Sequence, residues 1–255
     1  MRKTLAVVLP AYNEADNIPR LTQRWQKQAE SLALRGAELE ILIVDDGSGD
    51  ATRIVGDAQV RAYPNVRLLA HPVNKGLGEA LKTGLSFALD SMDDCPWVVV
   101  MDCDNTHDPA YILPMIDAMD GSEDTDVVIA SRYRKGSEVH GVPFYRFFVS
   151  YGARFVYTLS LHIRNVRDYT CGYRLYRTAS LRAVRDRFGE EWIRETGFAC
   201  MVELLYKLYL TGARMKEVPF SLRYDEKLGD SKMQVARTTS RSLALIRKLR
   251  KIRMG

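Results

Sequence analysis

The sequence has no long apolar run. None of its 255 residues falls in a stretch approaching the roughly 18 apolar residues that a membrane-spanning helix requires. The first apolar segment, residues 5–9, meets Pro10 and is too short for the core of a signal peptide. We therefore expect a cytoplasmic protein whose contact with a membrane is limited to the membrane surface.

Cysteine is scarce, and its spacing suggests no pairing. The four cysteines stand at 95, 103, 171 and 200, with no Cys-x-x-Cys pair among them. This spacing argues against a disulfide framework and against a zinc site, so we expect free thiols in a reducing compartment.

Several common catalytic signatures are also missing. The sequence lacks the Walker spacing Gly-x4-Gly-Lys-Ser/Thr, and no Gly-x-Gly-x-x-Gly follows its first predicted strand. No nucleophile elbow or Cys–His constellation is visible. The loop at 71–78 carries glycines and opens a helix, so it could face a phosphate, although a helix entry with turn residues explains it equally well.

Acidic residues are absent from the C-terminal end. Residues 237–255 contain seven Lys or Arg and no Asp or Glu, whereas the whole chain has a net charge of only +5. Such an end suits an anionic membrane surface or nucleic acid, and a solvated helix face is the simpler alternative. We divide the chain into one domain, residues 1–235, and a basic tail, residues 236–255. For this tail we expect contact with a membrane surface and no nucleic-acid partner.

The composition is that of an ordinary globular protein, with 46% apolar and 27% charged residues. Short apolar runs alternate with segments of helical character, which predicts an α/β fold with a mostly parallel, doubly wound sheet. We expect strands over 4–9, 39–44, 66–70, 97–101, 126–130 and 214–220, and helices over 15–34, 50–62, 78–91, 111–119 and 198–210.

Two carboxylates follow the fourth predicted strand. The apolar residues 98–101 lead into Asp102 and Asp104, and ligands of open α/β sheets bind at the carboxyl ends of strands. Side chains two apart on an extended segment point the same way, and paired carboxylates repel unless a cation lies between them. Mg²⁺ or Mn²⁺ bridged to a diphosphate would fit, because Mg²⁺ binds few protein carboxylates. Taken alone, two solvated acids are an equal alternative.

Aromatic residues are concentrated between 143 and 161, where seven occur together with Arg146 and Ser150. The segment predicts a long helix or a helix pair lying on a membrane or beneath a partner, and an ordinary core helix is the rival interpretation. Arg146 and Ser150 are four residues apart and would share one helix face, where a guanidinium and a hydroxyl could bind one anion.

Seven short motifs occur in a fixed order between about residues 5 and 235. They lie at 9–14, 44–48, 74–76, 101–104, 131–133, 168–177 and 229–232. Each is weak alone, but the ordered set resembles the family-two inverting glycosyltransferases of GT-A fold. Within that family the chain looks most like the dolichol-phosphate mannose synthases and polyprenyl-phosphate glycosyltransferases.

The resemblance implies a nucleotide-sugar donor, GDP-mannose or a UDP-sugar, and a divalent metal as cofactor. The residues that would surround the nucleoside are Pro10, Tyr12, Glu14, Val44 and Asp46.

The resemblance also implies roles at the phosphates. Asp102, Cys103 and Asp104 would form the Asp-x-Asp motif, with both acids on the metal and the diphosphate. The donor or acceptor phosphates would be reached from the other side by Arg132, Arg223 and Lys232, although Lys227 competes with Lys232 for this position.

For the acceptor, the resemblance implies a polyprenyl phosphate bound by Arg146 and Ser150. A soluble saccharide or natural product is the alternative acceptor, and a non-catalytic nucleotide-sugar or nucleic-acid binder is a rival of another class. A hydroxyl acceptor would need a general base, for which Glu203 stands roughly at the family position. A phosphate acceptor needs none, and we interpret Glu203 as a structural acid on an apolar helix.

Overall fold

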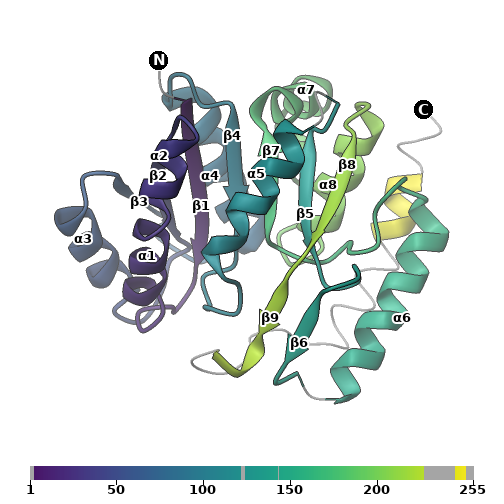
Figure 1. Ribbon diagram of the computed structural model, residues 1–255, viewed down its shortest axis with the longest axis horizontal. Helices are drawn as coiled ribbons and strands as arrows, with labels where there is room; N and C mark the ends of the chain where they lie inside the picture. The colour runs from purple at the N-terminus through teal and green to yellow at the C-terminus, as the bar shows by residue number, and fades with distance from the viewer. Residues whose placement is uncertain (1–2, 122–123, 143, 227–244, 251–255) are drawn as a thin grey trace.

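A seven-stranded sheet forms the centre of the molecule in a computed structural model, which describes residues 3–121, 124–142, 144–226 and 245–250 (Figure 1). The strand order is β3-β2-β1-β4-β7-β5-β8. The strands are β1 (Lys3–Ala11), β2 (Ala37–Asp45), β3 (Val66–Ala70), β4 (Trp97–Val100), β5 (Val127–Ser131), β7 (Arg174–Arg177) and β8 (Met215–Pro219). All pairs are parallel except those of β7, which runs antiparallel to both of its neighbours.

The inner strands form the core because helices cover both faces of the sheet. Residues 5–9 of β1 and 98–100 of β4 are at most 2% exposed. In Figure 1, α1 (Ile18–Gln26) and α5 (Ile112–Asp120) lie in front of the sheet, and α4 (Leu77–Ser91), α7 (Thr178–Phe188) and α8 (Cys200–Leu210) lie behind it. The remaining helices on this body are α2 (Ala29–Leu34) and α3 (Thr52–Ala62), with 3₁₀ turns η1 (Pro109–Tyr111) and η2 (Gly189–Trp192).

A second, smaller unit extends from one end of the sheet. It contains a two-stranded parallel ribbon, β6 (Glu138–His140) with β9 (Ser221–Arg223), the turn η3 (Tyr224–Glu226) and the long helix α6 (Phe144–Leu161). Residues 245–250 form a short helix beside the end of α6, where Arg250 Nε donates to the carbonyl oxygen of Ser160 at 3.2 Å (Figure 1). No helix in the described part of the chain is long and apolar enough to cross a membrane.

The predicted alternation is confirmed, with the following corrections. The helix expected over 15–34 is two helices: α1 begins at Ile18, with Pro19 in its first turn, and ends at Gln26, and α2 begins at Ala29. Residues 168–177, expected to be irregular, end in strand β7. Helix α7 follows directly and was not predicted. The strands of the ribbon, β6 and β9, were not predicted either.

The four cysteines are free, as their spacing predicts, and the structure shows that they are buried. The predicted basic tail is described only over 245–250. There Leu245, Ile246 and Leu249 are buried against the body, so this part of the tail packs on the domain through its apolar side.

Candidate functional site

The candidate site lies where the parallel strands end. Pro10 is in register with Val44, so the segments after β1 and β2 leave the sheet side by side. The loops are joined by hydrogen bonds: the backbone N–H of Asn13 donates to Ser48 Oγ at 2.9 Å, and that of Glu14 donates to Thr52 Oγ1 at 2.7 Å. The sheet therefore brings together the residues expected to surround the nucleoside, with Tyr12 40% exposed at the rim.

Asp46 holds the loop that opens α4. One carboxylate oxygen accepts from the backbone N–H of Lys75 at 2.9 Å and contacts His71 Nδ1 at 2.7 Å; the other accepts from the N–H of Gly76 at 2.7 Å. The carboxylate is 4% exposed. Its described contacts shape the loop at 74–76, and this loop borders the expected nucleoside position.

Asp102 and Asp104 follow β4 and are partly exposed, whereas Cys103 between them is buried. Asp104 Oδ1 is oriented by the hydroxyl and the backbone N–H of Thr106, at 2.7 and 3.2 Å. Asp102 faces Gly172, where an added Cβ would lie 2.6 Å from Asp102 Oδ1. Glycine at 172 therefore leaves space for this carboxylate.

The acid pair fits a hard divalent cation. Carboxylate oxygens are the ligands that Mg²⁺ and Mn²⁺ prefer. Within the described ranges, no group of three or more His, Cys, Asp or Glu side chains is arranged to hold a metal ion. A cation held by Asp102 and Asp104 would be in the usual situation of Mg²⁺, which is bound by one or two protein carboxylates together with substrate phosphates.

His107 lies buried beneath the acid pair and was not predicted. Its ring stacks on Phe220, with centroids 5.3 Å apart, and its Nε2 is 3.8 Å from Cys171 Sγ. Burial lowers the pKa of His107, and this outweighs the opposing effect of Asp102 and Asp104. A neutral imidazole adds no charge to compete with a cation at the acids.

Arg132 follows β5 and is held by Asp168, which sequence reasoning missed as a partner. Its Nε and Nη2 donate to the two carboxylate oxygens at 2.8 and 2.6 Å, and its backbone N–H donates to Asp168 Oδ2 at 3.1 Å. Burial would raise the pKa of Asp168, but the adjacent Arg132 guanidinium lowers it below the ordinary value. The bidentate pair fixes the guanidinium plane.

Glu217 on β8 holds the backbone of the segment that carries Asp168. Its Oε1 accepts from the backbone N–H groups of Arg167 and Asp168, each at 2.7 Å, and its Oε2 lies 3.0 Å from Arg134 Nε. Burial raises the pKa of Glu217. Asp168 therefore has a fixed backbone as well as a fixed side chain.

Arg223 is tied to the acid loop through its backbone, whose N–H donates to the carbonyl oxygen of Thr106 at 2.9 Å. Its guanidinium is 45% exposed and pairs with Asp225, with Nη2 2.8 Å from Oδ2. Arg24 joins the same two segments, since Nη2 lies 3.1 Å from Asp108 and Nη1 3.5 Å from Glu226. The turn that carries Arg223 is thus placed against the Asp102–Asp104 loop.

A family model described as glycosyl transferase family 2 matches residues 6–185 of the chain. The chain belongs to glycosyltransferase family 2. Among curated proteins, it is 30% identical over 228 residues to an undecaprenyl-phosphate mannosyltransferase of Micrococcus luteus, covering 89% of this chain and 86% of that protein. It is also 31% identical to a polyprenol monophosphomannose synthase of Mycolicibacterium smegmatis, with coverages of 89% and 80%.

Two further comparisons bear on length and fold. A dolichol-phosphate mannosyltransferase of Pyrococcus furiosus is 32% identical over 231 residues, and the alignment covers 90% of this chain but only 59% of that protein. A crystal structure of glucosyl-3-phosphoglycerate synthase from Mycobacterium tuberculosis, in complex with Mn²⁺, UDP and phosphoglyceric acid, matches with a TM-score of 0.67 at 18% identity. It covers 96% of this chain and 76% of its own, which confirms the predicted GT-A fold.

The glycosyltransferase therefore has most of its predicted site residues at one edge of the sheet. The remaining ones are not placed: Lys227 and Lys232 lie outside the described residues, and so do the side chains of Arg146 and Ser150, although both belong to α6. The acidic partners Asp168 and Glu217 gave no separate signal. They lie 36 and 85 positions after Arg132 in the sequence, and the fold brings Asp168 to the Arg132 guanidinium and Glu217 to the backbone of Asp168.

Proposed function

We propose that this glycosyltransferase is a metal-dependent, inverting enzyme that transfers a sugar from a nucleotide-sugar to a polyprenyl or dolichyl phosphate. The observation that carries the proposal is the meeting of Asp102 and Asp104 with the turn of Arg223 at the carboxyl edge of the sheet. The curated relatives named above support the lipid-phosphate acceptor and mannose as the sugar.

The chemistry follows from the charges at this edge. Cleavage of the donor develops negative charge on the departing diphosphate, and preorganised cations stabilise that charge as it forms. A divalent ion on Asp102 and Asp104 would supply Lewis-acid stabilisation when bound. Arg223, whose turn is held against this loop and whose guanidinium is 45% exposed, can add a positive charge. Arg132, held by Asp168, keeps part of its surface exposed and can bind a phosphate there.

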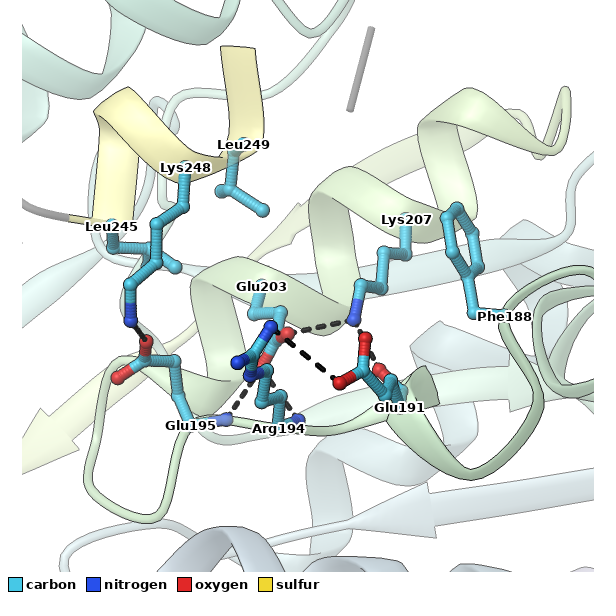
Figure 2. Close-up of a pocket in the computed structure, with 9 residues that line it drawn as sticks. All are labelled: Phe188, Glu191, Arg194, Glu195, Glu203, Lys207, Leu245, Lys248 and Leu249. Carbon is cyan, nitrogen blue, oxygen red and sulfur yellow. Dashed lines mark hydrogen bonds and ion pairs between the residues drawn. The ribbon is translucent and has the colours of Figure 1, made fainter. Parts of the chain in front are cut away.

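A phosphate acceptor agrees with the state of Glu203. A phosphate oxygen is anionic near neutral pH and attacks without a general base. Glu203 is 3% exposed, and both of its carboxylate oxygens accept hydrogen bonds from the protein, as Figure 2 shows. Both oxygens of the Glu203 carboxylate are therefore occupied by hydrogen bonds within the protein. Direct displacement by the acceptor phosphate at the sugar carbon would invert the anomeric centre.

Helix α6 offers an apolar surface beside the expected acceptor position. Tyr151, Phe155 and Leu159 are 42, 66 and 52% exposed and recur every four residues, so they form one stripe along the helix. Large exposed apolar side chains in a row are typical of surfaces that bind lipid or protein. We assign this stripe to the lipid chain and the adjoining membrane surface.

Label transfer tests the proposal. Radioactive GDP-mannose or a UDP-sugar is incubated with the protein, Mg²⁺ or Mn²⁺, and either extracted lipids or water-soluble saccharides. We expect label in the organic phase. Label only in water-soluble material would identify a soluble acceptor, and binding of the donor without transfer to either class would support a non-catalytic binder.

The acceptor assignment predicts a kinetic defect for Arg146→Ala. Loss of the two-pronged phosphate contact should raise the KM for polyprenyl phosphate about tenfold or more, the size expected for a hydrogen bond to a charged group. Arg146→Lys should recover part of the activity because an ammonium lacks the planar fork. Arg164→Ala, an exposed arginine just past α6, serves as the control. Lower stability with unchanged acceptor kinetics would make Arg146 structural.

The basic side of the 245–250 helix predicts salt-sensitive membrane binding. Arg247 and Arg250 are exposed, and each basic residue near an anionic bilayer contributes about 1 kcal/mol. The double variant Arg247→Gln, Arg250→Gln keeps the buried leucines and should bind anionic vesicles roughly thirtyfold less well in sedimentation at low salt. Donor binding should not change. Wild-type protein that ignores such vesicles would show that this helix face is merely solvated.

A further inference from the structure

A buried ion pair on α8 lies at the floor of a cavity of about 320 Å³, shown in Figure 2. Glu203 Oε1 accepts from Lys207 Nζ at 2.7 Å, and the two side chains are 4 and 3% exposed. Removing two charges from water is costly unless further hydrogen bonds complete the pair. Lys207 also donates to the carbonyl oxygen of Glu191 and lies 5.2 Å from the Phe188 ring centroid.

The other oxygen of Glu203 holds a loop. Oε2 accepts from the backbone N–H groups of Arg194 and Glu195, at 2.9 and 2.7 Å. Residues 194–196 belong to no helix or strand, so no ladder supplies partners for these two donors. The two donors are partly buried, so leaving them without partners would cost free energy, and Glu203 removes that cost in the observed conformation of the loop. In Figure 2 the carboxylate lies between Lys207 and this loop.

The far side of the same loop touches the turn that opens α4. The backbone N–H of Gly78 donates to the carbonyl oxygen of Thr196 at 3.0 Å. A Cβ at Gly78 would lie 1.9 Å from the carbonyl oxygen of Glu195, and a Cβ at Gly76 would lie 2.4 Å from that of Thr196. The two backbones are therefore packed as closely as glycine permits.

The turn at 76–78 also contacts Asp46, one of the residues expected at the donor site. Asp46 accepts from the backbone N–H of Gly76, and it borders the expected nucleoside position. The contacts form one continuous series: Glu203, the loop at 194–196, the turn at 76–78, and Asp46.

We propose that Glu203, with Lys207 as its counter-charge, is a positioning residue for the nucleotide-sugar donor. Glu203 fixes the loop at 194–196, and this loop determines the position of the 74–78 turn at the nucleoside end of the site. This inference rests on the proposed function. It assigns to Glu203 a role on the donor side instead of the role of a general base.

Kinetics of the double variant Glu203→Gln, Lys207→Met test this role, since the pair is removed without leaving one charge buried alone. We expect the donor KM and the Kd for the nucleoside diphosphate to rise about tenfold, as is typical of changes that act through an intervening segment. The acceptor KM and the pH profile of kcat should stay as in wild type. A general base would instead lower kcat by about 10² or more and remove one limb of the pH profile.

Gly78→Ala reaches the same contact from the other side and leaves the ion pair intact. Its Cβ must push the 194–196 loop away, so we expect the same rise in donor KM. Gly152→Ala is the matched control, because a Cβ at Gly152 meets nothing within 4 Å. It should leave the donor KM unchanged.

Two results separate this inference from the proposed function. If wild type binds a nucleoside diphosphate and transfers sugar, but both folded variants keep the wild-type donor KM, the positioning role is wrong and the proposed function stands. If wild type neither binds nucleoside diphosphates nor transfers label, the proposed function itself fails.

Discussion

Asp104→Asn should abolish metal-dependent nucleotide binding and lower turnover at least ~100-fold, the loss expected on removal of a principal electrostatic stabiliser. Asparagine keeps the shape of the side chain and the contact of its oxygen with the Thr106 hydroxyl, which lies 2.7 Å from Asp104 Oδ1. Only the charge facing the cation is lost. Turnover is measured against Mn²⁺ and Mg²⁺ concentration, and nucleotide binding by calorimetry with and without metal.

Asp117→Asn is a matched control for this variant. Asp117 lies on α5, is 61% exposed and pairs with Arg35 at 3.3 Å, away from the sheet edge. It should behave as wild type in both assays. Metal-dependent turnover in Asp104→Asn equal to that of wild type would overturn the assignment of the acid pair.

Asp168→Ala should lower both stability and activity. The Asp168 side chain is fully buried and Arg132 is 20% exposed, so the variant strands a guanidinium whose bidentate partner is gone. Breaking a largely buried pair costs about 3–5 kcal/mol, and the unsatisfied N–H groups of residues 132, 170 and 171 add to the loss. Because Arg132 would no longer be oriented, kcat should fall even at temperatures where the variant is folded. Urea unfolding and steady-state kinetics measure the two effects.

The same pair predicts the direction of a pH effect. The pKa of Asp168 is lower in the folded protein than its ordinary value, so the ionised carboxylate stabilises the fold. This contribution is complete above the unfolded pKa of about 3.9 and is lost as the pH falls through the lower folded pKa. Wild type should therefore lose more stability than Asp168→Ala over this acidic range.

Asp90→Ala is the control for the stability loss at neutral pH. It removes the exposed partner of Arg185 and should cost only about 0–1 kcal/mol. A loss of similar size in Asp168→Ala would show that its pair with Arg132 is unimportant.

The parallel part of the sheet was predictable because its strands are short apolar runs that end in Pro, Gly or acids. Strand β7 was not predictable, because its first residue, Arg174, is charged and yet fully buried. The Arg174 guanidinium donates to the carbonyl oxygens of Met201 and Tyr169. The break between α1 and α2 also left no sign. Trp25 and Leu32 are both buried and seven residues apart, a spacing that fits one uninterrupted helix.

The site was predictable where its residues follow strands in sequence, as Asp102 and Asp104 do. It was not predictable where function depends on pairing across the fold. The apolar helix around Glu203 indicated a structural acid but not the backbone N–H groups that it holds, and nothing in the local sequence of Glu217 distinguishes it from an acid exposed to solvent. The role of each glutamate depends on which backbone N–H groups lie next to its carboxylate, and only the three-dimensional structure shows this.

A comparison of two purified acceptors tests the central claim most directly. Polyprenyl phosphate and the corresponding polyprenol, which lacks the phosphate, are each presented with a radioactive nucleotide-sugar and divalent metal. We predict rapid labelling of the phosphate and no measurable labelling of the alcohol, because the proposed arginines bind a phosphate and Glu203, the acid considered as a general base, is hydrogen-bonded to the protein through both oxygens. Equal labelling of both lipids, or labelling of the alcohol alone, would contradict it.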